Sequence, residues 1–150
     1  MEGEQIQVDV SSVILSDIDD KRVTLSDFKG KVVVLSGGAQ AAADQAEEWL
    51  HALVKECSPM NDVKFSPIAF VGKLPPFVPK GMIKSAFKKM EVAPFIAWDD
   101  SPQKTLGVIK RNVSYIFVID KQGMLRFRMA ALLSDENLKT AIEQIKKFAV

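Results

Sequence analysis

The spacing of apolar residues changes within the first third of the chain. Residues 32–35 are four consecutive aliphatic residues, bounded by Gly30 and by Gly37-Gly38. An uninterrupted apolar run of this kind predicts a strand that is buried on both faces of a sheet. After Gly38 the apolar residues recur every three or four positions, which predicts an amphipathic helix that ends at Ser58-Pro59. Its apolar stripe comprises Ala46, Trp49, Leu50, Leu53, Val54 and Cys57.

The rest of the chain continues this alternation between extended and helical patterns. Pro67 is awkward for a central strand, and a proline-rich loop follows it. Ser134 is expected to cap the last helix. The pattern predicts one α/β domain over residues 1–150, with a mixed central sheet, helices on both faces and an N-terminal β extension. The expected segments are extended residues 6–15 and 23–25, strands 63–71 and 94–98, helices 79–90 and from 101, a hairpin of 115–120 with 124–130, and a helix from 134 onward.

Charge and composition exclude several classes of function. A net charge of +1 over 150 residues gives no electrostatic basis for binding nucleic acid or an anionic membrane. No apolar run approaches the roughly 20 residues that span a bilayer. The N-terminus is acidic and polar, so no signal peptide is expected within this sequence. This leaves a cytoplasmic protein or the mature part of an exported one, and the oligomeric state is open.

The chain has one cysteine and one histidine. A single thiol cannot form an intramolecular disulfide, a CxxC motif or a multi-cysteine zinc site. Cys57 shares the apolar stripe, so we expect a small buried hydrophobe and not a reactive thiol. His51 lies six residues earlier, which on a helix is about 9 Å of rise and about 240° of rotation. The two residues therefore cannot form a dyad, and no catalytic residue, metal or cofactor is expected.

Two segments of the chain form recognisable motifs. Residues 23–35 read Val-Thr-Leu-Ser-Asp-Phe-Lys-Gly-Lys-Val-Val-Val-Leu, and residues 118–123 read Val-Ile-Asp-Lys-Gln-Gly. In this order and separation, they resemble the TlpA-like and peroxiredoxin-like branch of the thioredoxin superfamily. The resemblance covers nearly the whole chain and implies a thioredoxin-like three-layer sandwich. In that family a Cys-x-x-Cys pair lies where the first central strand passes into a helix, because the helix N-terminus lowers the pKa of a thiol.

Both parts of the family's redox apparatus are replaced here. The cysteine positions correspond to residues 42–45, Ala-Ala-Asp-Gln, and the family's cis-proline corresponds to Ser114. A cis bond before serine costs roughly 2.5–4 kcal/mol, so a trans peptide and a rearranged loop are expected. The vestigial active-site region comprises Gln40, Ala42, Asp44, Gln45 and Ser114.

Within the superfamily, the chain is most similar to the YtfJ-like bacterial proteins, which also lack the cysteine pair. The similarity lies in Gly30-Lys31 and in the span from Phe95 to the C-terminus. Members of that group are usually exported, so this resemblance implies a periplasmic setting with the signal peptide removed.

Basic residues and glycines suggest three further sites. Residues 64–90 contain six lysines and no acidic residue, which favours either a docking face for an acidic protein or anionic lipid, or a solvated helix face. Gly37-Gly38 could hold an anion on backbone N–H groups, although we favour relief of close packing. Arg126 and Arg128 are two apart and are expected on one strand face, as an anion grip or as solvent-facing residues. The candidate partner face comprises Lys73, Phe77, Lys80, Lys84, Lys88 and Lys89.

Two hypotheses about function follow from the sequence. The first is a redox-inactive thioredoxin-like module that binds another protein or a ligand through the vestigial site or the lysine face. The alternative is a divergent thiol oxidoreductase or peroxidase-like enzyme that uses Cys57 or the thiol of a partner.

Overall fold

The computed structural model describes residues 3–57, 60–72, 76–110 and 112–149, and strands and helices alternate along them. The elements are β1 (Gly3–Asp9), β2 (Ile14–Ser16), β3 (Arg22–Thr24), η1 (Leu25–Phe28), β4 (Val32–Gly38), η2 (Gln40–Ala42), α1 (Ala43–Cys57), β5 (Val63–Phe70), α2 (Lys80–Lys88), β6 (Phe95–Ala97), α3 (Ser101–Leu106), β7 (Tyr115–Ile119), β8 (Met124–Ala130) and α4 (Asp135–Ala149).

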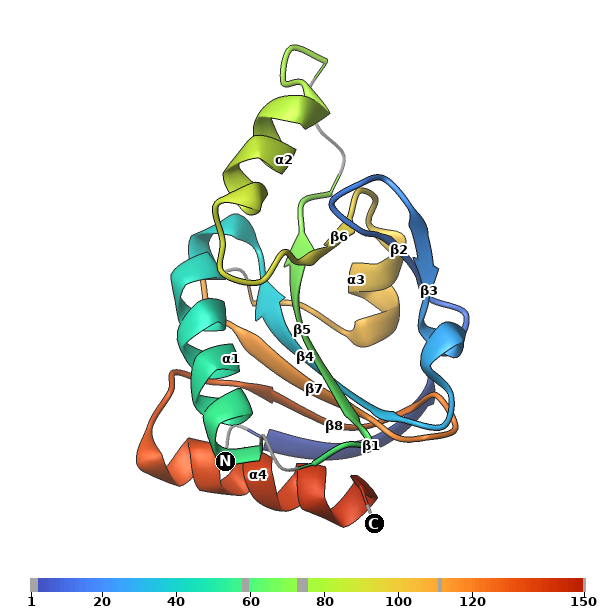
Figure 1. Ribbon diagram of the computed structural model, residues 1–150, viewed down its shortest axis with the longest axis vertical. Coiled ribbons are helices and arrows are strands. Elements are labelled where there is room, and N and C mark those ends of the chain that lie inside the picture. Colours follow the sequence, from blue (N-terminus) through green and yellow to red (C-terminus); the bar gives the residue numbers. More distant parts are fainter. Residues whose placement is uncertain (1–2, 58–59, 73–75, 111, 150) are drawn as a thin grey trace.

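The described strands form one mixed sheet in the order β1-β8-β7-β4-β5-β6-β2-β3 (Figure 1). β4 pairs in parallel with β5 and antiparallel with β7. A parallel neighbour requires a crossover connection, and α1 provides it between β4 and β5. The expected mixed sheet is confirmed, and β4 lies at its centre with every residue buried.

Helices cover both faces of the sheet because the side chains of β4 alternate between two cores. Val32 and Val34 pack with α1 and α4 in one cluster of buried residues. Val33 and Leu35 pack on the opposite face with Leu106 of α3 and with residues from the N-terminal segment. Helix α2 lies apart from these layers, beyond one end of the sheet (Figure 1). No helix in the described part of the chain is long and apolar enough to cross a membrane.

Two sequence-based expectations are corrected in detail. The extended segment 6–15 is interrupted after β1, because the Asp9 carboxylate accepts bonds from the backbone N–H and hydroxyl of Ser11 and forms a turn. Val54 is 40% exposed and lies outside the core.

The expected strand through Pro67 is confirmed, because Pro67 lies within β5. β6 pairs only with residues 68–70, so β5 has no second ladder at the proline.

The expectation that Arg126 and Arg128 share one face is wrong. The pairing of β7 with β8 shifts between Val118 and Ile119, and this bulge places Arg126 out of register. The Arg126 guanidinium lies 5.0 Å from the ring of Phe148 on α4. The Arg128 guanidinium donates to the Leu106 carbonyl on the α3 side, at 2.8 Å, and pairs with Glu4. The two arginines therefore cannot grip one anion together.

Candidate functional site

The candidate site lies where β4 ends and α1 begins. Gly38 is followed by the single turn η2 and by Ala43, the first residue of α1. Ala42 is fully buried, whereas Asp44 is exposed in the first turn of α1. Gln40 belongs to η2, and its side chain lies outside the described part of the structure. The helix N-terminus that would activate a thiol in a redox-active relative thus carries two alanines, a carboxylate and an amide.

Gln45 joins α1 to the loop that precedes β7. Its Nε2 donates to the Asn112 carbonyl at 3.0 Å, and its Oε1 accepts from the Ser114 N–H at 3.1 Å. The bond preceding Ser114 is trans, as expected. The structure therefore brings together Gln45 and Ser114, two of the residues predicted for the vestigial site. Both polar ends of the Gln45 side chain are used to hold the loop.

Replacing Gln45 by alanine is expected to lower the free energy of unfolding by about 1–2 kcal/mol, because two hydrogen bonds are lost at a half-buried position. Amide hydrogen exchange at Ser114 should accelerate by more than the loss of unfolding free energy alone would cause, because the restraint on the loop is lost locally. Urea unfolding and exchange NMR measure the two effects. Asp44→Ala, one residue away and exposed, is the matched control and should leave Ser114 exchange unchanged. Equal Ser114 exchange in wild type and Gln45→Ala would contradict the proposed restraint.

The two glycines at the end of β4 permit close packing. A Cβ on Gly37 would lie 1.7 Å from the Ile68 carbonyl oxygen of β5. A Cβ on Gly38 would lie 3.1 Å from the Val113 carbonyl oxygen and 3.4 Å from the Ala42 Cβ. These contacts support the interpretation that the glycines relieve steric crowding between β4, β5 and the loop at Ser114.

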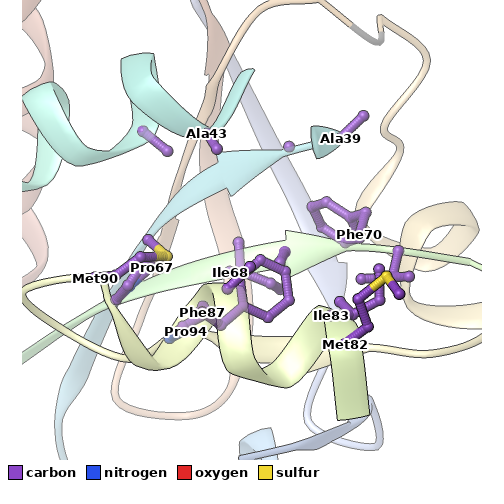
Figure 2. A pocket seen from close by; sticks show the side chains of 15 residues that line it. Ala39, Ala43, Pro67, Ile68, Phe70, Met82, Ile83, Phe87, Met90 and Pro94 are labelled. Carbon is purple, nitrogen blue, oxygen red and sulfur yellow. The ribbon is translucent and has the colours of Figure 1, made fainter. Parts of the chain in front are cut away.

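An apolar cavity of about 310 Å³ opens beside the vestigial site, between α1, β5 and α2. Figure 2 shows Ala39 and Ala43 on one side of it, and Ile83, Phe87 and Met90 on the α2 side. The sequence analysis missed this cavity. The available signal was the apolar stripe of α2, for which the sequence alone identifies no partner. The lining consists of Gly38, Ala39, Ala43, Ala46, Pro67, Ile68, Ala69, Phe70, Val71, Met82, Ile83, Ala86, Phe87, Met90 and Pro94.

Cys57 lies at the far end of α1 from the site. It is fully buried and packs in the core between the sheet, α1 and α4. Burial raises the pKa of its thiol, and the charge of Lys146 only partly opposes this effect. His51 is exposed on another side of the helix. The expected burial of Cys57 is confirmed, and the structure brings neither residue to the candidate site.

The predicted lysine face is partly engaged in contacts within the chain. Lys84 pairs with Asp20 of the β2–β3 turn, and its hydrogen bond lowers the pKa of that carboxyl group. Lys80 lies 4.9 Å from the centre of the Trp98 ring. The remaining residues of the face include Lys88, Lys89 and Phe77, which are exposed, and Lys73, which lies outside the described residues. These contacts attach α2 to the body of the protein.

No group of three or more potential metal ligands occurs in the described ranges. Neither a protein-family model nor the sequence of a curated protein matches the chain.

Solved structures match the chain over nearly all of its length. A DsbF homologue from Corynebacterium diphtheriae matches with a TM-score of 0.67 and 16% identity, over 96% of this chain and 93% of that one. BsSco, of the Sco family of cytochrome c oxidase assembly proteins, has a TM-score of 0.67 and 12% identity, over 98% and 96%. The exposed lipoprotein thioredoxin Etrx1 from Streptococcus pneumoniae has a TM-score of 0.61 and 20% identity, over 88% and 98%. Together with the sheet order and the two helical layers, these matches show that the chain has the thioredoxin-like fold.

Proposed function

We propose that this protein is a redox-inactive binding module, which uses the end of the sheet where thioredoxin-fold oxidoreductases carry their thiols. The observation that carries the proposal is Gln45. It occupies one of the two positions where the resemblance places cysteines, and both ends of its side chain are bonded to the Ser114 loop. A side chain committed to holding the loop leaves a rigid surface next to an apolar cavity. Apolar concave surfaces of this size are typical of ligand sites.

Disulfide exchange requires a thiolate that can reach a disulfide sulfur. The chain has one thiol, and that thiol is fully buried with a raised pKa. Both properties lower the concentration of accessible thiolate. The proposal includes a YtfJ-like relationship and a periplasmic location. Both fit a module that binds a ligand without using a thiol.

A second candidate function is thiol:disulfide chemistry with Cys57 or with the thiol of a partner. The structural neighbours favour it, because their names include DsbF, a lipoprotein thioredoxin and a thiol:disulfide interchange protein of the thioredoxin family. By name these proteins fit this alternative better than a redox-inactive module. In this chain, however, Cys57 could attack a disulfide only after the end of α1 had opened.

The two candidates predict opposite results in an insulin-reduction assay. We expect wild-type protein and Cys57→Ala to give the background rate of dithiothreitol alone, since no thiol is accessible. Native Cys57 should react with a thiol reagent at least about 100-fold more slowly than in urea, because labelling waits for opening of a buried segment. A thioredoxin with a Cys-x-x-Cys pair serves as the positive control. A rate above background that disappears in Cys57→Ala would instead establish the oxidoreductase.

A further inference from the structure

We propose that the cavity between α1, β5 and α2 binds the alkyl chain of a single fatty carboxylate of medium length, with its head group at Lys89. This inference rests on the proposed function and names the ligand class of the same site. It is carried by three features: the composition of the walls, the attachment of α2 and the position of Lys89.

The walls select an alkyl chain. Every residue that lines the cavity is glycine, alanine, proline, valine, isoleucine, methionine or phenylalanine. Such walls offer no side-chain donor or acceptor to orient a sugar, a nucleotide or a phosphate, and burying those groups unpaired is unfavourable. A hydrocarbon chain gives up no hydrogen bond on entering and gains from leaving water. The volume of about 310 Å³ is at the lower end for small-molecule sites and suits one chain.

Helix α2 forms an adjustable wall of the cavity. It has no fully buried residue, although its apolar stripe faces the cavity through Met82, Ile83 and Phe87, and Met90 lines the cavity two residues after the helix ends (Figure 2). Methionine adapts its shape to irregular ligands because it is unbranched and polarisable. The contacts of Lys80 with Trp98 and of Lys84 with Asp20 hold the first half of the helix. Small shifts of the second half can therefore fit chains of different length.

The lysine at which α2 ends provides the charge complementarity. Ala86 is exposed and lines the cavity, so it lies at the rim. Lys89, the C-cap of α2, is exposed and follows Ala86 by three positions, which places it on the same side of the helix. Lys88 continues the four-residue spacing of Lys80 and Lys84 and acts with them on Asp20, so it lies away from this rim. An anionic head group beside a chain in the cavity therefore meets the positive charge of Lys89.

Acidic groups make a neighbouring hollow less favourable for a carboxylate. This hollow shares Pro67 and Met90 with the cavity, and it is lined by Glu47 and Glu91 as well as by His51 and Lys55. Its two carboxylates outnumber its one lysine, so a carboxylate head group gains less there than at Lys89. The ligand is therefore expected to lie with its head group toward Lys89.

Isothermal titration of the intact protein with octanoate, decanoate and dodecanoate, all below micelle-forming concentrations, tests the proposal. We expect the affinity to rise about fourfold for each added methylene while the cavity fills. Decanol and decyltrimethylammonium should bind at least about tenfold more weakly than decanoate. An affinity that is independent of chain length, or equal for all three head groups, would overturn the proposal.

Two pairs of variants locate the site. Ala86→Trp should abolish decanoate binding because the indole closes the rim, whereas Ser85→Trp, also exposed on α2 but outside the lining, should bind normally. Lys89→Glu should weaken decanoate about tenfold or more and leave decanol unchanged. The control Lys104→Glu, on an exposed position of α3, should have no effect. Undiminished binding by Ala86→Trp would contradict the assignment.

The outcomes separate this inference from the proposed function. No binding of any fatty carboxylate, with insulin reduction at background, overturns the ligand class and leaves the redox-inactive module standing. Insulin reduction that depends on Cys57 overturns the module whatever the titration gives. Binding to vesicles of phosphatidylcholine and phosphatidylglycerol, without binding of free decanoate, would assign the lysines to a membrane surface and overturn the fatty carboxylate.

Discussion

Replacing Trp49 by alanine is expected to lower the free energy of unfolding by about 4 kcal/mol, which is within the range for large aromatic residues in cores. Trp49 is fully buried, with 0% of its surface accessible to solvent. It packs between α1, α4 and the sheet. Its indole Nε1 donates to the Ala131 carbonyl at 2.9 Å. Truncation leaves both a cavity and a buried carbonyl without its donor.

Urea unfolding followed by far-ultraviolet circular dichroism measures this loss without relying on tryptophan fluorescence. Trp49→Phe restores most of the volume but not the hydrogen bond, so we expect a loss of about 2 kcal/mol. Trp98→Phe, at the half-buried second tryptophan, should change stability by less than about 1 kcal/mol. A Trp49→Ala protein as stable as Trp98→Phe would show that α1 is not anchored through this residue.

The anchoring of α1 bears directly on the candidate site. Gln45 lies one turn before Trp49 on the same helix, and it can hold the Ser114 loop only where the helix is fixed against the sheet. Loss of the Trp49 contact should therefore also accelerate amide exchange at Ser114. The core and the site are linked through one rigid helix.

The parts of the fold that depend on local periodicity could be predicted from the sequence. The apolar run at 32–35 became the buried centre of β4, and the helical stripe that includes Trp49 and Leu53 became the buried side of α1. The Ser134 hydroxyl accepts from the Asn137 N–H at 3.1 Å, as expected of a helix cap. In each case the residues that determine the structure lie within a few positions of one another.

The features that were missed depend on residues far apart in the chain. Lys84 and Asp20 are separated by 64 positions, so nothing in the spacing of the lysines shows that one of them is paired. The bulge at Arg126 adds one residue to one strand of a hairpin, and strict alternation therefore wrongly placed Arg126 and Arg128 on one face. The cavity needs the relative placement of α1, β5 and α2, none of which has a polar motif that marks it.

The candidate site also combines features that the sequence predicts with features that it does not. The correspondence with the family predicted that Gln45 and Ser114 would be close, and the structure places their polar atoms within hydrogen-bond distance. That both ends of the Gln45 amide would be used for the loop was not predictable. The Asn112 carbonyl lies two residues before Ser114, in a loop whose conformation no local sequence pattern specifies.

Replacing Gly37 by alanine is expected to lower the free energy of unfolding by about 3 kcal/mol or more, the upper range for overpacking. The new Cβ would lie 1.7 Å from the Ile68 carbonyl oxygen and 2.7 Å from its carbonyl carbon. Both are backbone atoms, so no rotamer change relieves the clash and β4 must move away from β5. That movement disturbs the pairing of Gly37 with Ile68. Ile68 also lines the cavity, so ligand binding should weaken as well.

Two glycine variants in the same chain are matched controls for Gly37→Ala, and urea unfolding compares all three. A Cβ on Gly38 would meet its nearest neighbours at 3.1 and 3.4 Å, so Gly38→Ala should cost less than about 2 kcal/mol. Gly81 lies in α2 with nothing within 4 Å of its Cβ position. Gly81→Ala should therefore stabilise the protein by up to about 1 kcal/mol, because alanine favours the helix. If all three variants behaved alike, the close contact of β4 with β5 would not determine the need for glycine at position 37. A loss of stability and of ligand binding in Gly37→Ala alone would show that the close packing of β4 on β5 also determines the shape of the cavity, which Ile68 lines.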